Sequence, residues 1–383
     1  MMKVLILRVV AGMTLAVAGM AHAATHPAAS LDDLLEPIRT AHHLPALAAA
    51  VVRGDETVAM GTVGFRRDGG PERVTLNDKW HIGSCTKSMT AALAAMLIED
   101  GPWRWDTTLP ELFPELASSM QAEWRGATLE ELLTHHGGAP HELTENGLWG
   151  RLCERAGKPP REQRDYLTRE LLTRQKPAAP PGTKYIYANA GYALVGHAIE
   201  LKLDRPWEDA LRERLFRPLG MASAGFGAPA TVGMVDQPWG HSGGSGVPLV
   251  PVPPGRNADN PAAIGPGGTV HASIGDLAKY VAWQLRGARG EGRLLKPETF
   301  KKLHTRFVGD GDYACGWAVG ERSWGGGEVL SHAGSNTMFY TVIWLAPRKD
   351  FAVVVCTNVG GDDGTKGTDA AAGVLIQRFL AGQ

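Results

Sequence analysis

The segment "WHIGSCTKSMTAALAAMLIEDG", residues 80–101, combines a buried helix pattern with a lysine. From Ser84 to Glu99 its apolar residues recur at intervals of three and four, which is the spacing of a helix, and a Gly-Pro pair follows. Lys87 interrupts this apolar pattern one helical turn after Ser84. Because a charged group is costly to bury unless something uses it, Lys87 indicates chemistry.

The spacing of Ser84 and Lys87 predicts a hydroxyl and an amine on one helical face, about 5 to 6 Å apart at their Cβ atoms. A serine hydroxyl is a weak nucleophile until a neighbour takes its proton, and a lysine can do so if its surroundings keep it neutral. At a helix N-terminus, the backbone N–H of Ser84 can also stabilise a developing oxyanion. The pattern therefore predicts an activated serine.

Two other short motifs carry groups that such a serine needs. Tyr187 and Asn189 lie in "PGTKYIYANAGYALVGHAIE" at a predicted helix start, where the phenol can relay a proton and the amide can bind a substrate carbonyl. A plain tyrosine and a capping asparagine would show the same pattern. On a predicted strand, His332 precedes Gly334, which lets a ligand approach the backbone, and Ser335, whose N–H can be a second oxyanion donor.

Strand patterns occur at both ends of the chain, and helical patterns lie between them. A helix is expected over residues 30–43, and two strands joined at Gly54-Asp55-Glu56 form a predicted hairpin. Further strands are expected in the segments 313–320, 328–334, 339–347 and 351–358, before a last helix over 368–380.

This order predicts an α/β protein of the α+β kind, with an antiparallel β-sheet flanked by helices and an additional all-helical domain. Residues 24–102 and 246–383 would form the sheet domain, and residues 103–245 the inserted helical domain.

Composition favours a small-molecule partner. The 383 residues are 44% hydrophobic, and 39 Lys and Arg nearly balance 40 Asp and Glu. Because no basic run is interleaved with aromatic residues, nucleic acid is not an expected partner.

The first 23 residues are typical of a signal peptide. Lys3 and Arg8 precede the apolar stretch from Val9 to Met20, and Ala21-His22-Ala23 is a small-x-small cleavage site. A retained anchor is the alternative, but twelve apolar residues are short for a span. We expect cleavage after Ala23, a periplasmic or secreted protein, and no membrane span in the mature chain.

Three other features have ordinary interpretations. The cysteines are expected to be mostly small buried side chains, although disulfides remain an alternative: Cys85, Cys153, Cys315 and Cys356. The motif Gly240–Gly244 fits the G-x-S-x-G nucleophile elbow but lacks the strand and helix around it, so a Gly-rich loop is expected. Four side chains of "THHGGAPHE" lack the fixed geometry of a metal-binding H-E-x-x-H helix, so a structural role is expected for them: His135, His136, His141 and Glu142.

Taken together, these motifs resemble the penicillin-recognising serine hydrolases, the superfamily of class C β-lactamases, DD-peptidases and related serine esterases. The resemblance extends over nearly the whole mature chain, and includes "LEELLTHHGG", "RPLGMASAGF", "IGPGGTVHASIGDLAKY" and "SHAGSNTMFYTVIWLAPRKDFAVVVCTN". It implies a β-lactamase/transpeptidase-like fold, with the site in a cleft between the two domains. It also implies that the loop with His135, His136, His141 and Glu142 borders this cleft.

The resemblance also implies roles for single residues. Ser84 would be the nucleophile, Lys87 and Tyr187 the proton-transfer pair, and Asn189 a substrate contact. The N–H groups of Ser84 and Ser335 would form the oxyanion hole. Which of Lys87 and Tyr187 acts as the base is left open, because coupled groups share their protons.

One departure concerns the substrate. Class C β-lactamases carry Lys-Thr-Gly where this chain has His332-Ala333-Gly334, and histidine is a weaker, pH-dependent cation. Among the resembling proteins, this histidine is similar to that of some DD-peptidases and many esterase-like members.

The sequence therefore predicts a serine hydrolase that acts through an acyl-enzyme on a small ester or amide, without metal or cofactor. A DD-carboxypeptidase or weak class C-type β-lactamase acting on D-alanyl peptides or penicillins is one alternative, and a non-catalytic binding protein with the same fold is another.

Overall fold

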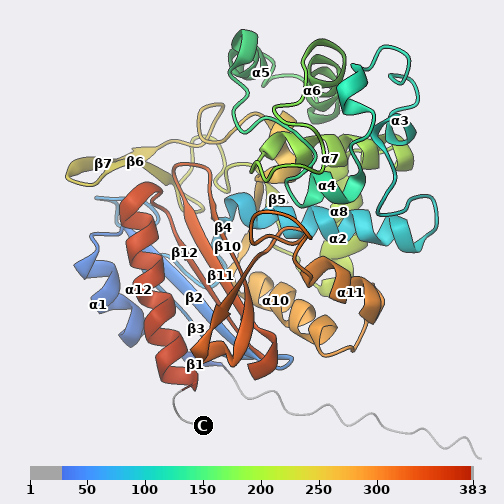
Figure 1. Ribbon diagram of the computed structural model, residues 1–383. Helices are drawn as coiled ribbons and strands as arrows, with labels where there is room; N and C mark the ends of the chain where they lie inside the picture. The colour runs from blue at the N-terminus through green and yellow to red at the C-terminus, as the bar shows by residue number, and fades with distance from the viewer. Residues whose placement is uncertain (1–27, 381–383) are drawn as a thin grey trace, which may run out of the picture.

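A seven-stranded sheet forms one half of the protein in the computed structural model, which describes residues 28–380 (Figure 1). The strand order is β1-β3-β2-β12-β11-β10-β9, antiparallel except for the parallel pair β1 and β3. The strands of this sheet are β1 (Ala29–Ser30), β2 (Ala46–Arg53), β3 (Glu56–Gly64), β9 (Ala318–Arg322), β10 (Gly327–Ser335), β11 (Tyr340–Ala346) and β12 (Phe351–Thr357).

Strands distant in sequence pair at the centre of this sheet, where β2 lies beside β12. Both strands are buried along nearly their whole length, because helices cover both faces. Alternate residues face opposite cores, so Ala50 and Val354 lie in one hydrophobic cluster and Val51 and Val353 in the other. The predicted hairpin of β2 and β3 is confirmed.

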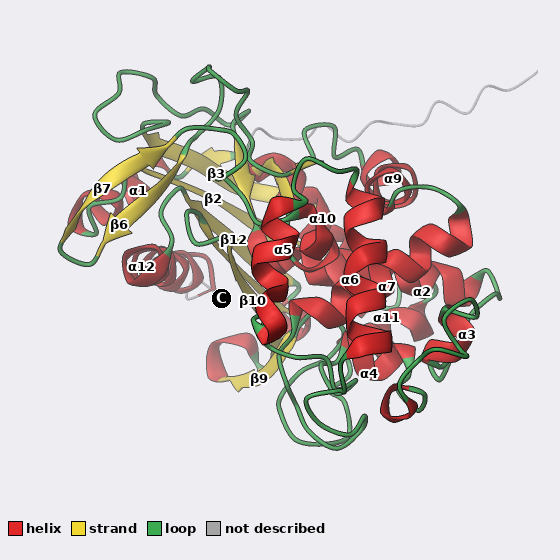
Figure 2. Cartoon of the chain, turned by 90° about the horizontal axis from the view of Figure 1, so that it is seen from above, coloured by secondary structure: helices red, strands yellow, loops and turns green. Residues whose placement is uncertain are grey.

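Helices flank the sheet and fill the other half of the molecule. α1 and α12 contact one face of the sheet, and α10 contacts the strands from the other side. Figure 2 shows α3 to α7 grouped beside the sheet, away from α1 and α12. The helices are α1 (Asp32–Ala41), α2 (Thr86–Glu99), α3 (Leu109–Leu112), α4 (Leu129–Leu133), α5 (Leu148–Glu154), α6 (Pro160–Arg174), α7 (Asn189–Leu203), α8 (Trp207–Leu211), α9 (Arg217–Leu219), α10 (Ile274–Ala288), α11 (Pro297–His304) and α12 (Gly361–Leu380).

Helix α2 connects the two halves. Its residues are buried without a break from Thr86 to Leu97, and it packs against α7 and α8. The turn directly before it, Gly83–Cys85, contacts β10 and β11 of the sheet. A helix buried all round has no polar face. The fold class expected from the sequence, an antiparallel sheet flanked by helices with a helical region, is confirmed.

Helices α3 to α9 all come from the segment 103–245, but this segment also contains strands. β5 (Gly225–Phe226) joins β4 (Lys79–His81) and β8 (Val270–Ser273) in a small sheet. The exact division into residues 24–102 with 246–383 and residues 103–245 therefore stays a prediction.

Two local expectations were wrong. The expected Gly-rich loop at residues 240–244 is a strand, β6 (Gly240–Gly244), paired with β7 (Val247–Val252), because glycines with positive φ at Gly243 and Gly244 permit an irregular hairpin. The expected strand over 313–320 begins only at Ala318. Gly316 has φ +84°, so the chain turns there against the start of α2 instead of extending.

The four cysteines are free, and all except the half-buried Cys153 are buried, as interpreted from the sequence. The signal peptide expected over residues 1–23 lies outside the described residues. Between residues 28 and 380, no helix has the combined length and apolar character that crossing a membrane requires.

Candidate active site

Ser84 lies in a tight turn, residues Gly83–Cys85, directly before α2. Strand β10 approaches this turn so closely that a Cβ on Gly334 would lie 2.0 Å from the carbonyl oxygen of Ile82 and 2.7 Å from the backbone nitrogen of Ser84. A Cβ on Gly83, where φ is +48°, would lie 2.2 Å from the backbone nitrogen of Ser335. The contact requires glycine at both positions, Gly83 and Gly334, because a side chain at either one would overlap the other segment. It brings the backbone nitrogens of Ser84 and Ser335 close together.

The amine of Lys87 is fully buried and has three polar neighbours. Its Nζ lies 3.0 Å from Ser84 Oγ, 2.6 Å from Asn189 Oδ1 and 2.7 Å from the Gly267 carbonyl oxygen. The two carbonyl oxygens only accept, so they take two N–H bonds of the amine. In a neutral amine, the lone pair is then left for the Ser84 hydroxyl proton.

Burial also sets the charge of this amine. Removal from water lowers the pKa of Lys87 to about 7, and no carboxylate is among the groups that perturb it. A large share of Lys87 is therefore neutral at neutral pH. This is the state in which an amine can accept a proton from serine.

Tyr187 contacts both groups. Its ring centroid is 4.7 Å from Lys87 Nζ, and Ser84 is among the groups that perturb the pKa of its phenol. Burial raises the pKa of Tyr187 well above its usual value, and the Ser84 hydroxyl only partly opposes this rise. The phenol is therefore protonated, and it can pass a proton while the amine holds one.

Asn189 is the first residue of α7, where its side chain points back to the site. The sequence predicts a substrate contact for its amide. In the structure the amide oxygen is bound to Lys87, so at least this atom orients the amine.

His332 lies on β10 beside the site but is buried and uncharged. Its Nδ1 is 2.6 Å from the carbonyl oxygen of Ala333, so Nδ1 carries the proton, and Nε2 accepts the hydroxyl proton of Tyr313 at 2.8 Å. Desolvation and the nearby Lys87 lower the pKa of His332 to about 3. At neutral pH this side chain is not a cation.

Sequence reasoning missed Tyr313 and undervalued His135. Tyr313 lies in the segment expected to be a strand, and the turn there brings its phenol to His332. His135 was expected to line a cleft, and its ring is 4.4 Å from that of Tyr187, with its Nδ1 accepting the N–H of Ala188. Residues 313–320 contain one tyrosine and residues 134–142 contain none, so composition gave no signal for either residue.

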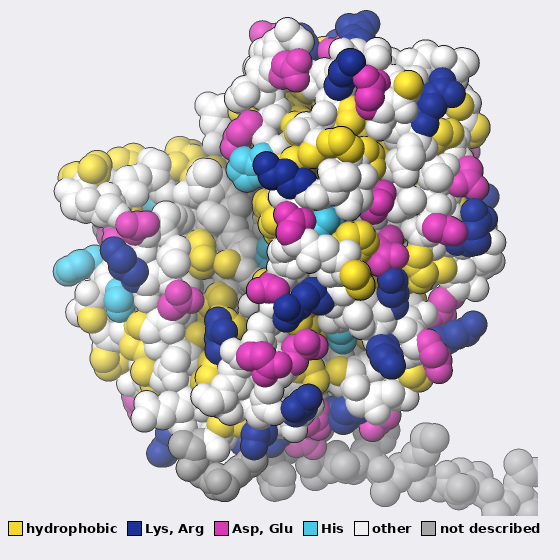
Figure 3. Space-filling model, in the orientation of Figure 1, with side chains coloured by type: hydrophobic (Ala, Val, Ile, Leu, Met, Phe, Trp, Pro, Cys, Tyr) yellow, Lys and Arg dark blue, Asp and Glu magenta, His cyan; other side chains and the backbone are white. Residues whose placement is uncertain are grey.

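The molecular face drawn in Figure 3 carries mixed charge. On the face shown in Figure 3, Lys and Arg side chains alternate with Asp and Glu, and the surface is hollowed between the projecting β6–β7 hairpin and the helical half. This face shows no broad patch of one sign.

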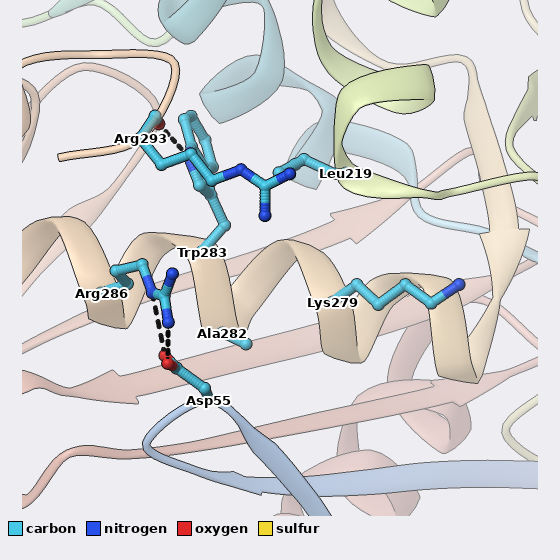
Figure 4. A pocket seen from close by; sticks show the side chains of 7 residues that line it. All are labelled: Asp55, Leu219, Lys279, Ala282, Trp283, Arg286 and Arg293. Atoms are coloured by element: carbon cyan, nitrogen blue, oxygen red, sulfur yellow. Dashed lines mark hydrogen bonds and ion pairs between the residues drawn. The ribbon is translucent and has the colours of Figure 1, made fainter. Parts of the chain in front are cut away.

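A separate pocket lies under the β2–β3 turn and contains none of the predicted site residues (Figure 4). Arg286 on α10 binds Asp55 there, so the pocket holds an ion pair that ties the hairpin to the helix. Its lining residues are Asp55, Leu219, Lys279, Ala282, Trp283, Arg286 and Arg293.

Known proteins are similar to this chain in sequence and in fold. Unguisins hydrolase ungD' of Aspergillus campestris is 28% identical over 340 residues, covering 85% of this chain and 60% of that protein. Penicillin-binding protein 4 of Amycolatopsis lactamdurans is 27% identical over 340 residues, covering 86% of this chain and 84% of that protein. The chain thus spans less than two thirds of the length of the first of these relatives.

A solved structure has the same fold. The octameric penicillin-binding protein homologue from Pyrococcus abyssi superimposes with a TM-score of 0.72 at 20% identity, over 91% of this chain and 78% of that one. The Beta-lactamase family model matches residues 31–377, which is most of the chain. With the fold and this match agreeing, the chain belongs to the Beta-lactamase family, within the penicillin-recognising serine hydrolases.

Proposed function

We propose that the protein is an exported serine hydrolase that cleaves a small ester or amide through an acyl-enzyme. The observation that carries this proposal is the contact between Ser84 Oγ and the buried amine of Lys87. Burial lowers the pKa of this amine to about 7. Two curated relatives support the class of activity, since one is named a hydrolase and the other a penicillin-binding protein.

In the first half-reaction, Ser84 Oγ attacks the acyl carbon while its proton passes to Lys87 Nζ. The carbonyl oxygen becomes an oxyanion, which the backbone N–H groups of Ser84 and Ser335 stabilise. The bond to the leaving group then breaks, and the leaving group takes a proton through the Tyr187 phenol, which Lys87 restores. The product is an ester of Ser84.

In the second half-reaction, water attacks this ester and gives its proton to the same pair. The serine oxygen leaves, takes the proton back, and the free acid departs. We assign the role of base to Lys87, because the pKa of Tyr187 is raised while that of Lys87 is lowered to about 7.

The surroundings of His332 favour an uncharged acyl substrate. Both ring nitrogens are bound within the protein, and a pKa of about 3 leaves no charge to hold a substrate carboxylate. Penicillins and D-alanyl peptides carry such a carboxylate. A relative named penicillin-binding protein 4 nevertheless keeps a DD-carboxypeptidase or weak β-lactamase as the second candidate.

A substrate panel separates these candidates. The panel contains p-nitrophenyl esters, a chromogenic cephalosporin and a D-Ala-D-Ala peptide, and we expect the highest kcat/KM with an ester. A higher kcat/KM with the cephalosporin or the peptide would overturn the assignment to esters and amides.

Intact-mass analysis after exposure to a fluorophosphonate tests the mechanism itself. We expect one adduct on the wild-type protein and none on Ser84→Ala. An unlabelled wild type, or an adduct that persists in Ser84→Ala, would leave the non-catalytic binding protein as the better description.

A further inference from the structure

His81 is fully buried at the end of β4, two residues before the turn that carries Ser84. Its Nδ1 accepts a hydrogen bond from the backbone N–H of Gly83 at 3.1 Å, and its Nε2 lies 2.9 Å from a carboxylate oxygen of Asp259. Because a backbone N–H can only donate, Nδ1 is unprotonated, and Nε2 donates its proton to Asp259. The carboxylate thereby selects the tautomer that holds Gly83 in place.

The other oxygen of Asp259 reaches the second half of the site. It accepts a hydrogen bond from Asn336 Nδ2 at 3.3 Å and from the backbone N–H of the residue that follows Asp259 at 2.8 Å. Asn336 is buried and directly follows Ser335. Its amide oxygen accepts the N–H groups of Met338 and Phe339, which fixes the turn between β10 and β11.

Asp259 therefore contacts both segments whose backbone nitrogens meet at the site. One segment is the turn with Ser84, held through His81, and the other is the end of β10 with Ser335, held through Asn336. These segments are far apart in sequence, and each N–H donor must be placed within a few tenths of an ångström to stabilise an oxyanion.

We propose that Asp259 and His81 are positioning residues that set the geometry of the oxyanion hole. The inference rests on the proposed function, because it requires an oxyanion to form next to Ser84. Neither residue takes part in proton transfer. Their effect on the reaction passes through the backbone of Gly83 and Ser335.

Two substitutions of His81 separate positioning from packing. In His81→Asn the amide oxygen replaces Nδ1 and can still accept the Gly83 N–H, although Asp259 loses its partner. In His81→Gln the terminal amide replaces Nε2 and can still bind Asp259, but nothing accepts the Gly83 N–H. We expect His81→Gln to lose about 100-fold in kcat and His81→Asn to keep most of it.

Asp259→Asn tests the carboxylate without changing its size. Either orientation of the new amide turns one accepting oxygen into a donor, so it faces a donor of His81 or of Asn336. We expect a loss of kcat of about 100-fold with KM nearly unchanged.

A phenylboronic acid gives the readout that a packing effect would not move. Such an inhibitor adds the serine oxygen and places an oxygen where the oxyanion forms, so its affinity follows transition-state binding. Across the three variants, we expect its inhibition constant to rise by the same factor by which kcat/KM falls.

His197→Gln is the matched control. His197 is also a buried histidine with a carboxylate partner, Glu200 at 3.0 Å, but it lies on α7 away from the serine. We expect it to lower the melting temperature and to leave kcat and boronate affinity unchanged.

Equal kcat in His81→Asn and His81→Gln, or a boronate affinity that stays constant while kcat falls, would overturn the positioning role. A wild type that forms no fluorophosphonate adduct would instead overturn the proposed function. Failure of the positioning role is therefore seen in the variants, and failure of the proposed function is seen in the wild type.

Discussion

Among single residues, the proposed reaction depends most on the charge of one amine, that of Lys87. Lys87 is bound to two carbonyl oxygens and to the Ser84 hydroxyl, with no carboxylate to keep it protonated. Burial lowers the pKa of Lys87 to about 7, so this amine can both take and return a proton near neutral pH.

Replacing Lys87 with methionine should nearly abolish hydrolysis. The apolar side chain fills similar volume but accepts no proton, so we expect kcat/KM for a p-nitrophenyl ester to fall about 1000-fold. The melting temperature of the same sample checks that the variant is folded. A folded variant that retains a tenth of wild-type kcat/KM would rule out Lys87 as the base.

The pH dependence of activity should report the same amine. The base must be neutral, so kcat/KM should fall about tenfold per pH unit below the Lys87 pKa of about 7 and level off above it. Steady-state rates with an uncharged ester between pH 5 and 9 give the curve, and fluorophosphonate labelling rates should follow it. A profile that is flat across this range would contradict the assignment.

At the scale of elements, β10 and the turn before α2 form the site by direct backbone contact. This contact depends on Gly334, since a Cβ there would lie 2.0 Å from the Ile82 carbonyl oxygen. The contact between β10 and the turn therefore sets the positions of the two backbone N–H groups proposed as the oxyanion hole.

Gly334→Ala should separate the two elements. The added methyl must push β10 away from the turn, so the two N–H donors no longer converge, and we expect kcat to fall about 100-fold. Gly320→Ala on the neighbouring strand β9 is the control, because its Cβ would meet no atom closer than 3.6 Å. Full activity in Gly334→Ala would show that the close approach is not needed.

Apolar periodicity predicted helices and strands correctly where one pattern continued over many residues. The helix expected from Ser84 to Glu99 is confirmed, apart from its first turn, and so are the hairpin and the last three strands of the chain. The segment 313–320 failed because Gly316 adopts a left-handed turn against α2, a contact that no local pattern records.

At the scale of the whole molecule, a buried ionic cluster supports the helical half. The Arg164 guanidinium on α6 binds Glu200 at 2.6 Å and Glu208 at 2.7 Å, and it donates to the carbonyl oxygen of Ala262. Ala262 begins the turn that ends at Gly267, the residue whose carbonyl oxygen holds Lys87. The cluster thus connects α6, α7 and the rear wall of the site.

Arg164→Met should destabilise the protein strongly. Glu200 would remain buried without its cation, which typically costs about 3 to 5 kcal/mol in the free energy of unfolding. Urea unfolding measures this change. Arg169→Met, which breaks an exposed pair with Asp165 on the same helix, should cost less than about 1 kcal/mol. Equal losses in the two variants would contradict the role of burial.

Sequence patterns alone predicted the fold class, which is confirmed, and they single out Ser84 as the candidate nucleophile with Lys87 as its partner amine. Apolar periodicity specifies helices and strands locally, and a spacing of three residues places Ser84 and Lys87 on one helix face wherever that helix lies. Tyr187 and Asn189 could be found for the same reason, since they occur together in one short motif.

The protonation of the candidate site follows from packing and could not be predicted from the sequence. The lowered pKa of Lys87, the tautomer of His332 and the link through Asp259 all depend on burial and on partners distant in sequence. A pKa is set by solvent exclusion and nearby charge, and these arise when α2, α7 and β10 pack together. For that reason, sequence motifs point to Ser84, Lys87 and Tyr187 as the candidate reacting groups, and packing sets the pKa and the hydrogen-bond partners of each.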